Sequence, residues 1–209
     1  LSAGDTLLVR GGGFYERDLQ VSSSGTAAAP ILIANYPGEH PVLDGAYAEF
    51  RTKGNADWEL YDAGTGLYRS RQAFPGAVSV GGAFGAANRG WRLVPYEDRA
   101  TLASNEEDYA SQWPYYYVGP GAFWDPSDQR IYVRLKQGKY QALVGSNVPP
   151  SPDPSGLALF LFPDCELLDF QPGVAHVEVR GIDLLYGEAA VEIGPGAHHI
   201  TIRHAEIRA

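Results

Sequence analysis

Two acidic residues near the end of the chain occupy matching places in a repeat. Residues 176–184 align with residues 199–207 without a gap, so that Asp183 matches Glu206. If the two segments are neighbouring strands in register, matched side chains lie about 4.8 Å apart. Two carboxylates at that spacing can hold a Ca²⁺ ion, or serve as the acid and nucleophile of a retaining glycosidase, whose carboxyl groups stand about 5 to 5.5 Å apart. Asp183 and Glu206 are therefore candidate metal ligands, with Ca²⁺ as the candidate cofactor.

The repeat also aligns Arg180 with Arg203, and these arginines are candidate substrate-binding residues beside the carboxylates. Because strand side chains alternate between two faces, an inward-facing Val179 leaves Arg180 on the outer surface, and Asp183 follows there. The residues expected to face inward are Val177, Val179, Ile182 and Leu184. The alternative interpretation is that the charged positions are simply solvated, and repeat because the strand repeats.

A second group of candidates is aromatic. Residues 46–150 are dense in Trp and Tyr, whose rings stack on sugars while their polar edges stay hydrated. The candidate carbohydrate-binding residues are Trp113, Tyr115, Tyr117 and Trp124. The alternative is that these rings form the core of a small β-structure, since alternation within residues 115–117 sends some rings inward whichever face binds.

Several histidines could act as bases or metal ligands: His176, His199 and His204. The alternative is that they are turn residues bonded to the backbone. His198 and His199 are adjacent, but the sequence shows neither a third ligand nor the fixed spacing typical of a zinc site. We therefore predict no zinc site from the sequence.

The elements that would position these residues are short β-strands. The repeat has a period of 23 residues, and residues 190–193 form another alternating segment before the turn-forming Gly194-Pro-Gly196. Strands repeating at such a period are typical of a solenoid, in which each coil buries its apolar face on its neighbours. A leucine-rich repeat has a similar period, but its Leu-x-x-Leu-x-Leu-x-x-Asn signature is missing. The pattern predicts an all-β chain with a parallel β-helix.

Composition narrows the function classes. The chain has 209 residues with 44% hydrophobic and 20% charged side chains, which is ordinary for a folded domain. The net charge of −9 argues against a nucleic-acid partner. It also disfavours an acidic glycan unless a cation bridges the two. No apolar run approaches the length of a membrane span, and the single Cys165 cannot form an internal disulfide. The absence of Met suggests a processed chain or an excised segment.

Three segments at the front of the chain, residues 3–13, 24–31 and 36–45, carry a family resemblance. They resemble the opening coils of right-handed parallel β-helix proteins. That group includes chondroitinase B, polysaccharide lyases of the alginate-lyase type, and several glycoside hydrolases. The resemblance implies a right-handed parallel β-helix fold and a carbohydrate-active protein. In the lyases, an arginine or a cation neutralises the uronate while a basic side chain removes a proton. No basic residue of this sequence matches a lyase motif in that role, so no catalytic residue is assigned.

The expected domain organisation has three parts. Residues 1–45 form the first coils, and residues 151–209 form further coils after a proline-rich linker. Between them, residues 46–150 are expected to form an antiparallel β insertion. Within it, residues 121–135 predict a hairpin turning at Asp125-Pro-Ser-Asp128.

The function expected from these features is that of a secreted or cell-surface bacterial protein acting on or binding extracellular polysaccharide, as a lyase, a hydrolase or a non-catalytic binder. The repeat stops in mid-strand at residues 207–209, and an open solenoid end leaves apolar side chains and strand edges in water. One interpretation is that the chain continues and that its catalytic residues lie beyond it. The other is a structural or adhesive protein that self-associates end to end through its last coil.

Overall fold

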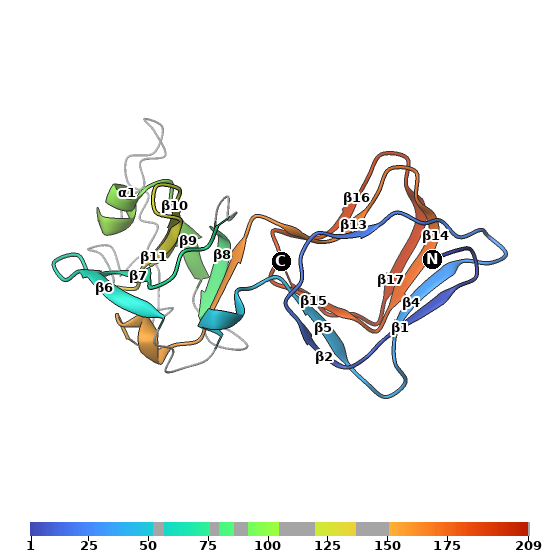
Figure 1. Ribbon diagram of the computed structural model, residues 1–209, viewed down its shortest axis with the longest axis horizontal. Helices are drawn as coiled ribbons and strands as arrows, with labels where there is room; N and C mark the ends of the chain where they lie inside the picture. The colour runs from blue at the N-terminus through green and yellow to red at the C-terminus, as the bar shows by residue number, and fades with distance from the viewer. Residues whose placement is uncertain (52–56, 76–79, 86–91, 105–119, 137–150, 209) are drawn as a thin grey trace. The chain divides into compact units, whose positions relative to one another are not determined.

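The computed structural model describes residues 1–51, 57–75, 80–85, 92–104, 120–136 and 151–208. The fold is all-β, built from several short parallel and antiparallel sheets with very little helix in the described residues (Figure 1). The chain divides into two compact units. Unit 1 comprises Leu1–Ala46 and Cys165–Ala209, and unit 2 comprises Tyr47–Asp164.

Unit 1 consists of three parallel sheets, ordered β1-β4-β14-β17, β2-β5-β15-β18 and β3-β13-β16, which Figure 1 shows as the sides of a triangle. The chain visits the sheets in turn and returns to the first one. We call each circuit a pass: β1–β2–β3, then β4–β5–β13, then β14–β15–β16, then β17–β18. The strands are β1 (Thr6–Val9), β2 (Gly12–Phe14), β3 (Leu19–Val21), β4 (Ile31–Asn35), β5 (Pro41–Asp44), β13 (Glu166–Phe170), β14 (Ala175–Arg180), β15 (Asp183–Leu185), β16 (Ala189–Ile193), β17 (His198–Arg203) and β18 (Ile207–Arg208).

The register of the last two passes is the one that the repeat predicts. Val177 of β14 lies opposite Ile200 of β17, and Arg180 lies opposite Arg203. On its other side, Val177 lies opposite Ile31 of β4. The stacked side chains form one apolar interior, since successive passes bury the same strand positions. The buried members are Ile31, Leu43, Leu167, Leu168, Phe170, Val174, Val177, Val179, Ile182, Leu184 and Ala190. The prediction that Val177, Val179, Ile182 and Leu184 face inward is therefore confirmed.

Unit 2 contains a seven-stranded sheet, ordered β12-β8-β9-β10-β11-β7-β6, in which every pairing except β9–β10 is antiparallel. The predicted hairpin is confirmed, because Gly121–Asp125 pairs with Arg130–Arg134 in antiparallel register. The elements are η1 (Ala48–Phe50), β6 (Trp58–Asp62), β7 (Leu67–Ser70), β8 (Val80–Gly85), β9 (Arg92–Pro95), α1 (Arg99–Ser104), β10 (Gly121–Asp125), β11 (Arg130–Arg134), η2 (Pro154–Gly156) and β12 (Leu159–Pro163).

The second boundary of unit 2 lies later than the sequence suggested. We expected the coils to resume by residue 151, but β12 pairs antiparallel with β8 of unit 2. Leu159 and Leu161 are fully buried in the core of that unit. The apolar run around β12 is equally compatible with either core. The parallel strands resume only with β13, two residues after the boundary at Asp164.

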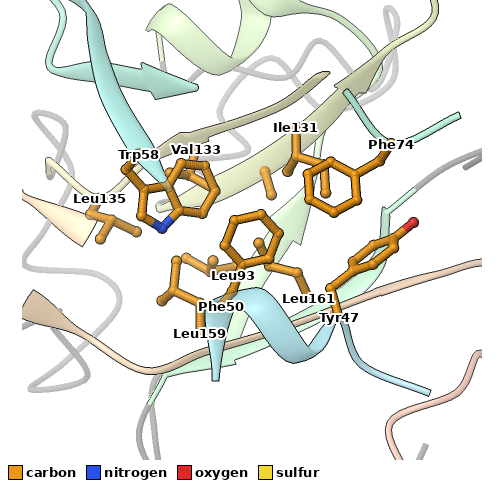
Figure 2. Close-up of a cluster of buried hydrophobic side chains, with 11 residues drawn as sticks. Tyr47, Phe50, Trp58, Phe74, Leu93, Ile131, Val133, Leu135, Leu159 and Leu161 are labelled. Atoms are coloured by element: carbon orange, nitrogen blue, oxygen red, sulfur yellow. The ribbon is translucent and has the colours of Figure 1, made fainter. Parts of the chain in front are cut away.

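The core of unit 2 is aromatic, as Figure 2 shows. The ring of Phe50 stacks on Trp58 at a centroid distance of 4.6 Å, and Phe74 lies 5.3 Å from Phe50. Tyr47 meets Phe74 edge-on at 4.8 Å. Aliphatic side chains of β9, β11 and β12 surround these rings. For these described aromatics, the structure supports the core interpretation of the aromatic density.

Candidate functional site

A row of polar side chains crosses all four passes of unit 1, at the corner between the sheet of β14 and the sheet of β15. At one end, Arg10 forms a hydrogen-bonded ion pair with Glu39. The next residue, His40, forms a hydrogen bond with Asp183. Asp183 in turn accepts a hydrogen bond from the backbone N–H of Glu206. We call this set the corner row, and its members are Arg10, Tyr36, Glu39, His40, Asp183 and Glu206.

The centre of the corner row is a histidine held by a buried carboxylate. His40 Nε2 lies 2.7 Å from Asp183 Oδ2. The His40 side chain is 69% exposed, whereas the Asp183 side chain is only 9% exposed. When Nε2 donates to the carboxylate, a neutral imidazole presents Nδ1 as an acceptor. A buried carboxylate that fixes the imidazole tautomer while its other nitrogen stays available is the arrangement that general acid–base catalysis needs.

The buried state of Asp183 corrects one expectation from the sequence. Alternation predicted a solvated, outward Asp183, but the residue is 6% exposed. Both carboxylate oxygens have partners, because Oδ2 meets His40 and Oδ1 accepts from the Glu206 N–H at 2.7 Å. Glu206 is exposed, and its own carboxylate pairs with Arg208. A Ca²⁺ ion shared by Asp183 and Glu206 would have to displace His40 and Arg208, and it stays a prediction.

The two candidate arginines lie side by side on β14 and β17, where Arg180 is the register partner of Arg203. Both share one carboxylate. Arg203 reaches Glu178 Oε1 at 2.6 Å, and Arg180 approaches the same atom at 3.9 Å. The two arginine side chains remain 39% and 48% exposed. The pair keeps one net positive charge after Glu178, which suits a polar or anionic ligand.

The first end of the corner row combines an exposed aromatic ring with an ion pair. The Arg10 guanidinium lies 4.6 Å from the centre of the Tyr36 ring, which is 42% exposed. Hydrogen bonds from Arg10 and from the Gly11 N–H, the latter at 2.6 Å, hold the pKa of Glu39 below its ordinary value against the opposing effect of desolvation. An exposed ring beside fixed charges is a common sugar-contacting arrangement.

The aromatic candidates from the sequence are only partly described. Trp113, Tyr115 and Tyr117 lie outside the described residues. Trp124 is half-buried against the unit 2 core and donates its indole N–H to the carbonyl of Phe74 at 3.1 Å. Its ring edge is therefore engaged within unit 2. Tyr36 and His40 were not identified as candidates from the sequence, because they stand in a Pro- and Gly-containing segment of the kind that forms turns. Nothing local signals that His40 meets a residue 143 positions away.

Three histidines meet at the opposite end of β14 and β17. His176 stacks on His199 at a centroid distance of 4.5 Å, and His198 lies edge-on to both. One ligating atom from each of the three lies within 4.8 Å of the others. The sequence expectation that His198 and His199 lack a third ligand is therefore wrong. The register of the passes supplies His176 from 23 residues away.

Comparison with known proteins gives a fold likeness. The chain superposes on a solved structure described as the complex of XylC with xylose, with a TM-score of 0.53 and 14% identity over 95% of this chain and 32% of that chain. A second structure, described as a glycoside hydrolase, gives a TM-score of 0.45 and 14% identity over 88% of this chain and 44% of that chain. At this identity the XylC likeness concerns the fold. The chain spans about a third of the length of the XylC chain.

No protein-family model matches the chain, and neither does any curated protein. In the described residues, no helix combines the length and the apolar character needed to cross a lipid bilayer.

Proposed function

We propose that unit 1 is a right-handed parallel β-helix and that the chain belongs to a secreted or cell-surface bacterial protein that binds or acts on extracellular polysaccharide. The observation that carries the proposal is the likeness to XylC, whose structure holds xylose, over nearly the whole of this chain. The stacking of three parallel sheets in four passes supports the β-helix. The corner row is the proposed sugar-contacting surface.

Within this surface, Tyr36 is the proposed stacking platform and His40 the proposed acid–base group. In a lyase reaction, His40 Nδ1 would take the proton from the carbon beside a uronate carboxylate. The electron pair then forms a carbon–carbon double bond as the bond to the glycosidic oxygen breaks, and water protonates that oxygen. Asp183 is the positioning residue, since its carboxylate holds the other ring nitrogen at 2.7 Å.

Binding to a panel of neutral and acidic polysaccharides, xylan included, tests this surface. Tyr36→Ala should weaken retention about tenfold, because burying about 55 Å² of apolar ring surface against a sugar contributes about 1.4 kcal/mol. The matched control is Tyr15→Ala, which removes a comparably exposed ring (47% against 42%) outside the corner row. If no glycan binds the wild-type chain, or if both variants bind alike, the proposed surface is wrong.

Product analysis distinguishes the reaction classes if cleavage is found. A lyase leaves an unsaturated sugar at each new end, whereas a hydrolase leaves a reducing end without unsaturation. In the lyase case His40→Ala should abolish cleavage. The alternative glycosidase, or a Ca²⁺ site, would use Asp183 and Glu206. If replacing both residues by Ala leaves cleavage and Ca²⁺ affinity unchanged, a functional role of the carboxylate pair is ruled out.

A second candidate function is end-to-end assembly, and a specific observation favours it. The first pass exposes Leu7 at 44%, Phe14 at 39% and Leu19 at 40%, around a cavity of about 390 Å³ that reaches the interior of unit 1. At the last passes, Ile193 and Ile207 are 55% and 51% exposed. Apolar rows at both terminal passes suit stacking of one chain on the next. Sedimentation should then show polymers that grow with concentration, and Leu7→Lys should return them to single chains.

A further inference from the structure

The histidine cluster at the start of β14 and β17 follows from two equivalent turns. Pro172-Gly173 precedes His176 by the same spacing at which Pro195-Gly196 precedes His199. Each glycine has a positive φ, 78° and 76°, so the two turns share one backbone course. The strands that follow are in register, with Ala175 opposite His198. The stacking of His176 on His199 is therefore imposed by the fold.

An unusual backbone conformation brings the third histidine to the pair. His176 and His199 adopt φ values of 54° and 55°, in the left-handed region that non-glycine residues seldom occupy. At such a residue the strict alternation of a strand does not hold. His198 and His199 consequently direct their rings to one side, and their Nδ1 atoms lie 2.8 Å apart. The register partner of His198 in the preceding pass is Ala175, which carries only a methyl group.

The cluster offers imidazole nitrogens, and this chemistry selects its ligand. Imidazole suits Zn²⁺, Cu²⁺, Ni²⁺ and Co²⁺, whereas Ca²⁺ and Mg²⁺ require oxygen ligands. With Zn–N bonds of about 2.0–2.1 Å, tetrahedral ligand nitrogens stand about 3.3 Å apart. One nitrogen from each ring lies within 4.8 Å of the other two, and the Nδ1 atoms of His198 and His199 are 2.8 Å apart. Small rotations of side chains that are partly or fully exposed suffice to close the site.

We propose that His176, His198 and His199 bind one divalent transition-metal ion of the Zn²⁺ class, with a fourth position left to water. The ion links the third pass to the fourth, since one ligand comes from β14 and two from β17. This site is independent of the corner row, which lies beyond the other end of the same strands. Its existence does not depend on the proposed carbohydrate function.

Titration of the chelator-treated, untagged chain with Zn²⁺ alone, followed by calorimetry, tests the proposal. The expected result is one equivalent bound, together with a higher melting temperature. Titration with Co²⁺ should give the intense visible absorption of a four-coordinate ion. Loss of an outer-shell partner already weakens a metal site about 10- to 100-fold. Loss of a ligand in His199→Asn should therefore weaken Zn²⁺ binding by about 100-fold or more.

The chain contains a matched control. His204 is exposed, lies on the last pass and has the same left-handed backbone (φ 54°), but it is not in the cluster. Asn tolerates that conformation, so His204→Asn repeats the chemical change without removing a ligand and should bind Zn²⁺ as the wild type does. His198→Gln removes another ligand at an exposed residue with ordinary backbone conformation. It therefore tests the loss of a ligand even if His199→Asn does not fold. The proposal is overturned if the wild type binds no Zn²⁺, or if His204→Asn loses binding as His198→Gln does.

Discussion

The two units use their conspicuous side chains in opposite ways. In unit 1, stacking of successive passes aligns polar residues that are far apart in sequence, and so produces the corner row and the histidine cluster. In unit 2, the described aromatic residues Tyr47, Phe50, Trp58 and Phe74 fill a core, with Phe50 fully buried against Trp58. The comparison teaches that a high density of aromatic residues indicates a core, whereas polar residues that stacking brings together from distant parts of the chain indicate a surface site.

The strongest way to break the comparison is to open each core separately. Phe50→Ala in unit 2 and Phe170→Ala in unit 1 each remove a fully buried ring, and each should lower the free energy of unfolding by about 3–5 kcal/mol. All four tryptophans fall within unit 2: Trp58, Trp91, Trp113 and Trp124. Trp fluorescence should therefore report the shift for Phe50→Ala. For Phe170→Ala, the unfolding midpoint followed by circular dichroism should fall, while the midpoint followed by Trp fluorescence should stay unchanged. A common shift in both signals would show that the units unfold together.

A smaller effect tests the stacking in unit 1 directly. A Cβ atom at Gly25 would lie 2.5 Å from the carbonyl oxygen of His176 and 2.6 Å from the Ile31 nitrogen. Both are backbone atoms, so relief requires the passes to separate, and Gly25→Ala should cost about 1–3 kcal/mol. At Gly13, on the same pass, an added Cβ meets nothing within 4 Å. Gly13→Ala should therefore be neutral or slightly stabilising, and chemical denaturation of both variants provides the measurement. Equal destabilisation by both variants would show that close backbone packing at Gly25 does not set the spacing between the passes.

How much of this was predictable depends on whether a residue belongs to the repeat. The 23-residue repeat predicted that Val177 lies opposite Ile200, because the apolar positions of both strands must face one interior. His40 could not be placed in the same way. It lies in the segment between β4 and β5, where the second pass has five residues, Tyr36 to His40, and the third pass has only Gly181 and Ile182. No periodicity can assign a partner to a residue in such an extra segment.

Two other outcomes have local causes that alternation alone does not capture. The histidine cluster depends on the left-handed backbone of His199, which the sequence does not reveal for a non-glycine residue. The strand β12 carries apolar side chains on both faces, all of them buried. Such a segment fits a parallel or an antiparallel sheet equally well. Its membership of unit 2 is decided by pairing with β8, a contact between distant parts of the chain.

A local element of unit 2 should respond more weakly than either core. Asp98 caps α1, its Oδ1 accepting from the N–H groups of Ala100 at 2.7 Å and Thr101 at 2.8 Å. Asp98→Ala should cost about 0.5–1 kcal/mol. The Thr101 N–H above all, then that of Ala100, holds the pKa of Asp98 below its ordinary 3.8 against desolvation. A lowered folded-state pKa gives stability that is present above pH 3.8 and lost as the pH falls.

The variant Asp98→Asn separates the two contributions. It keeps the accepting oxygen and caps about as well as Asp, but it cannot titrate. Thermal melting at neutral pH should place it near the wild type. On acidification the wild type should lose slightly more stability than the Asn variant, and identical acid curves would contradict a charged cap.

The substitution expected to change folding stability least at neutral pH is Cys165→Ala, in unit 1. Burial, opposed by the charge of Arg17, raises the pKa of this thiol from 9.0 to about 11. The protonated form is therefore favoured by folding, so stability is unaffected below pH 9 and declines as the pH rises from about 9 to 11. Cys165→Ala should remove that decline in alkaline denaturation curves. A wild-type decline that persists in the variant would assign it to other groups.

The same thiol reports the opening of unit 1, because Cys165 belongs to that unit and is only 5% exposed. At neutral pH a thiol reagent should label it slowly, at a rate limited by local or global unfolding. Phe170→Ala should accelerate labelling, whereas Phe50→Ala should leave it unchanged if unit 2 can open alone. Labelling accelerated equally by both substitutions would mean that the parallel passes hold together only while the antiparallel unit is folded, and the division of the molecule into separately stable parts would fail.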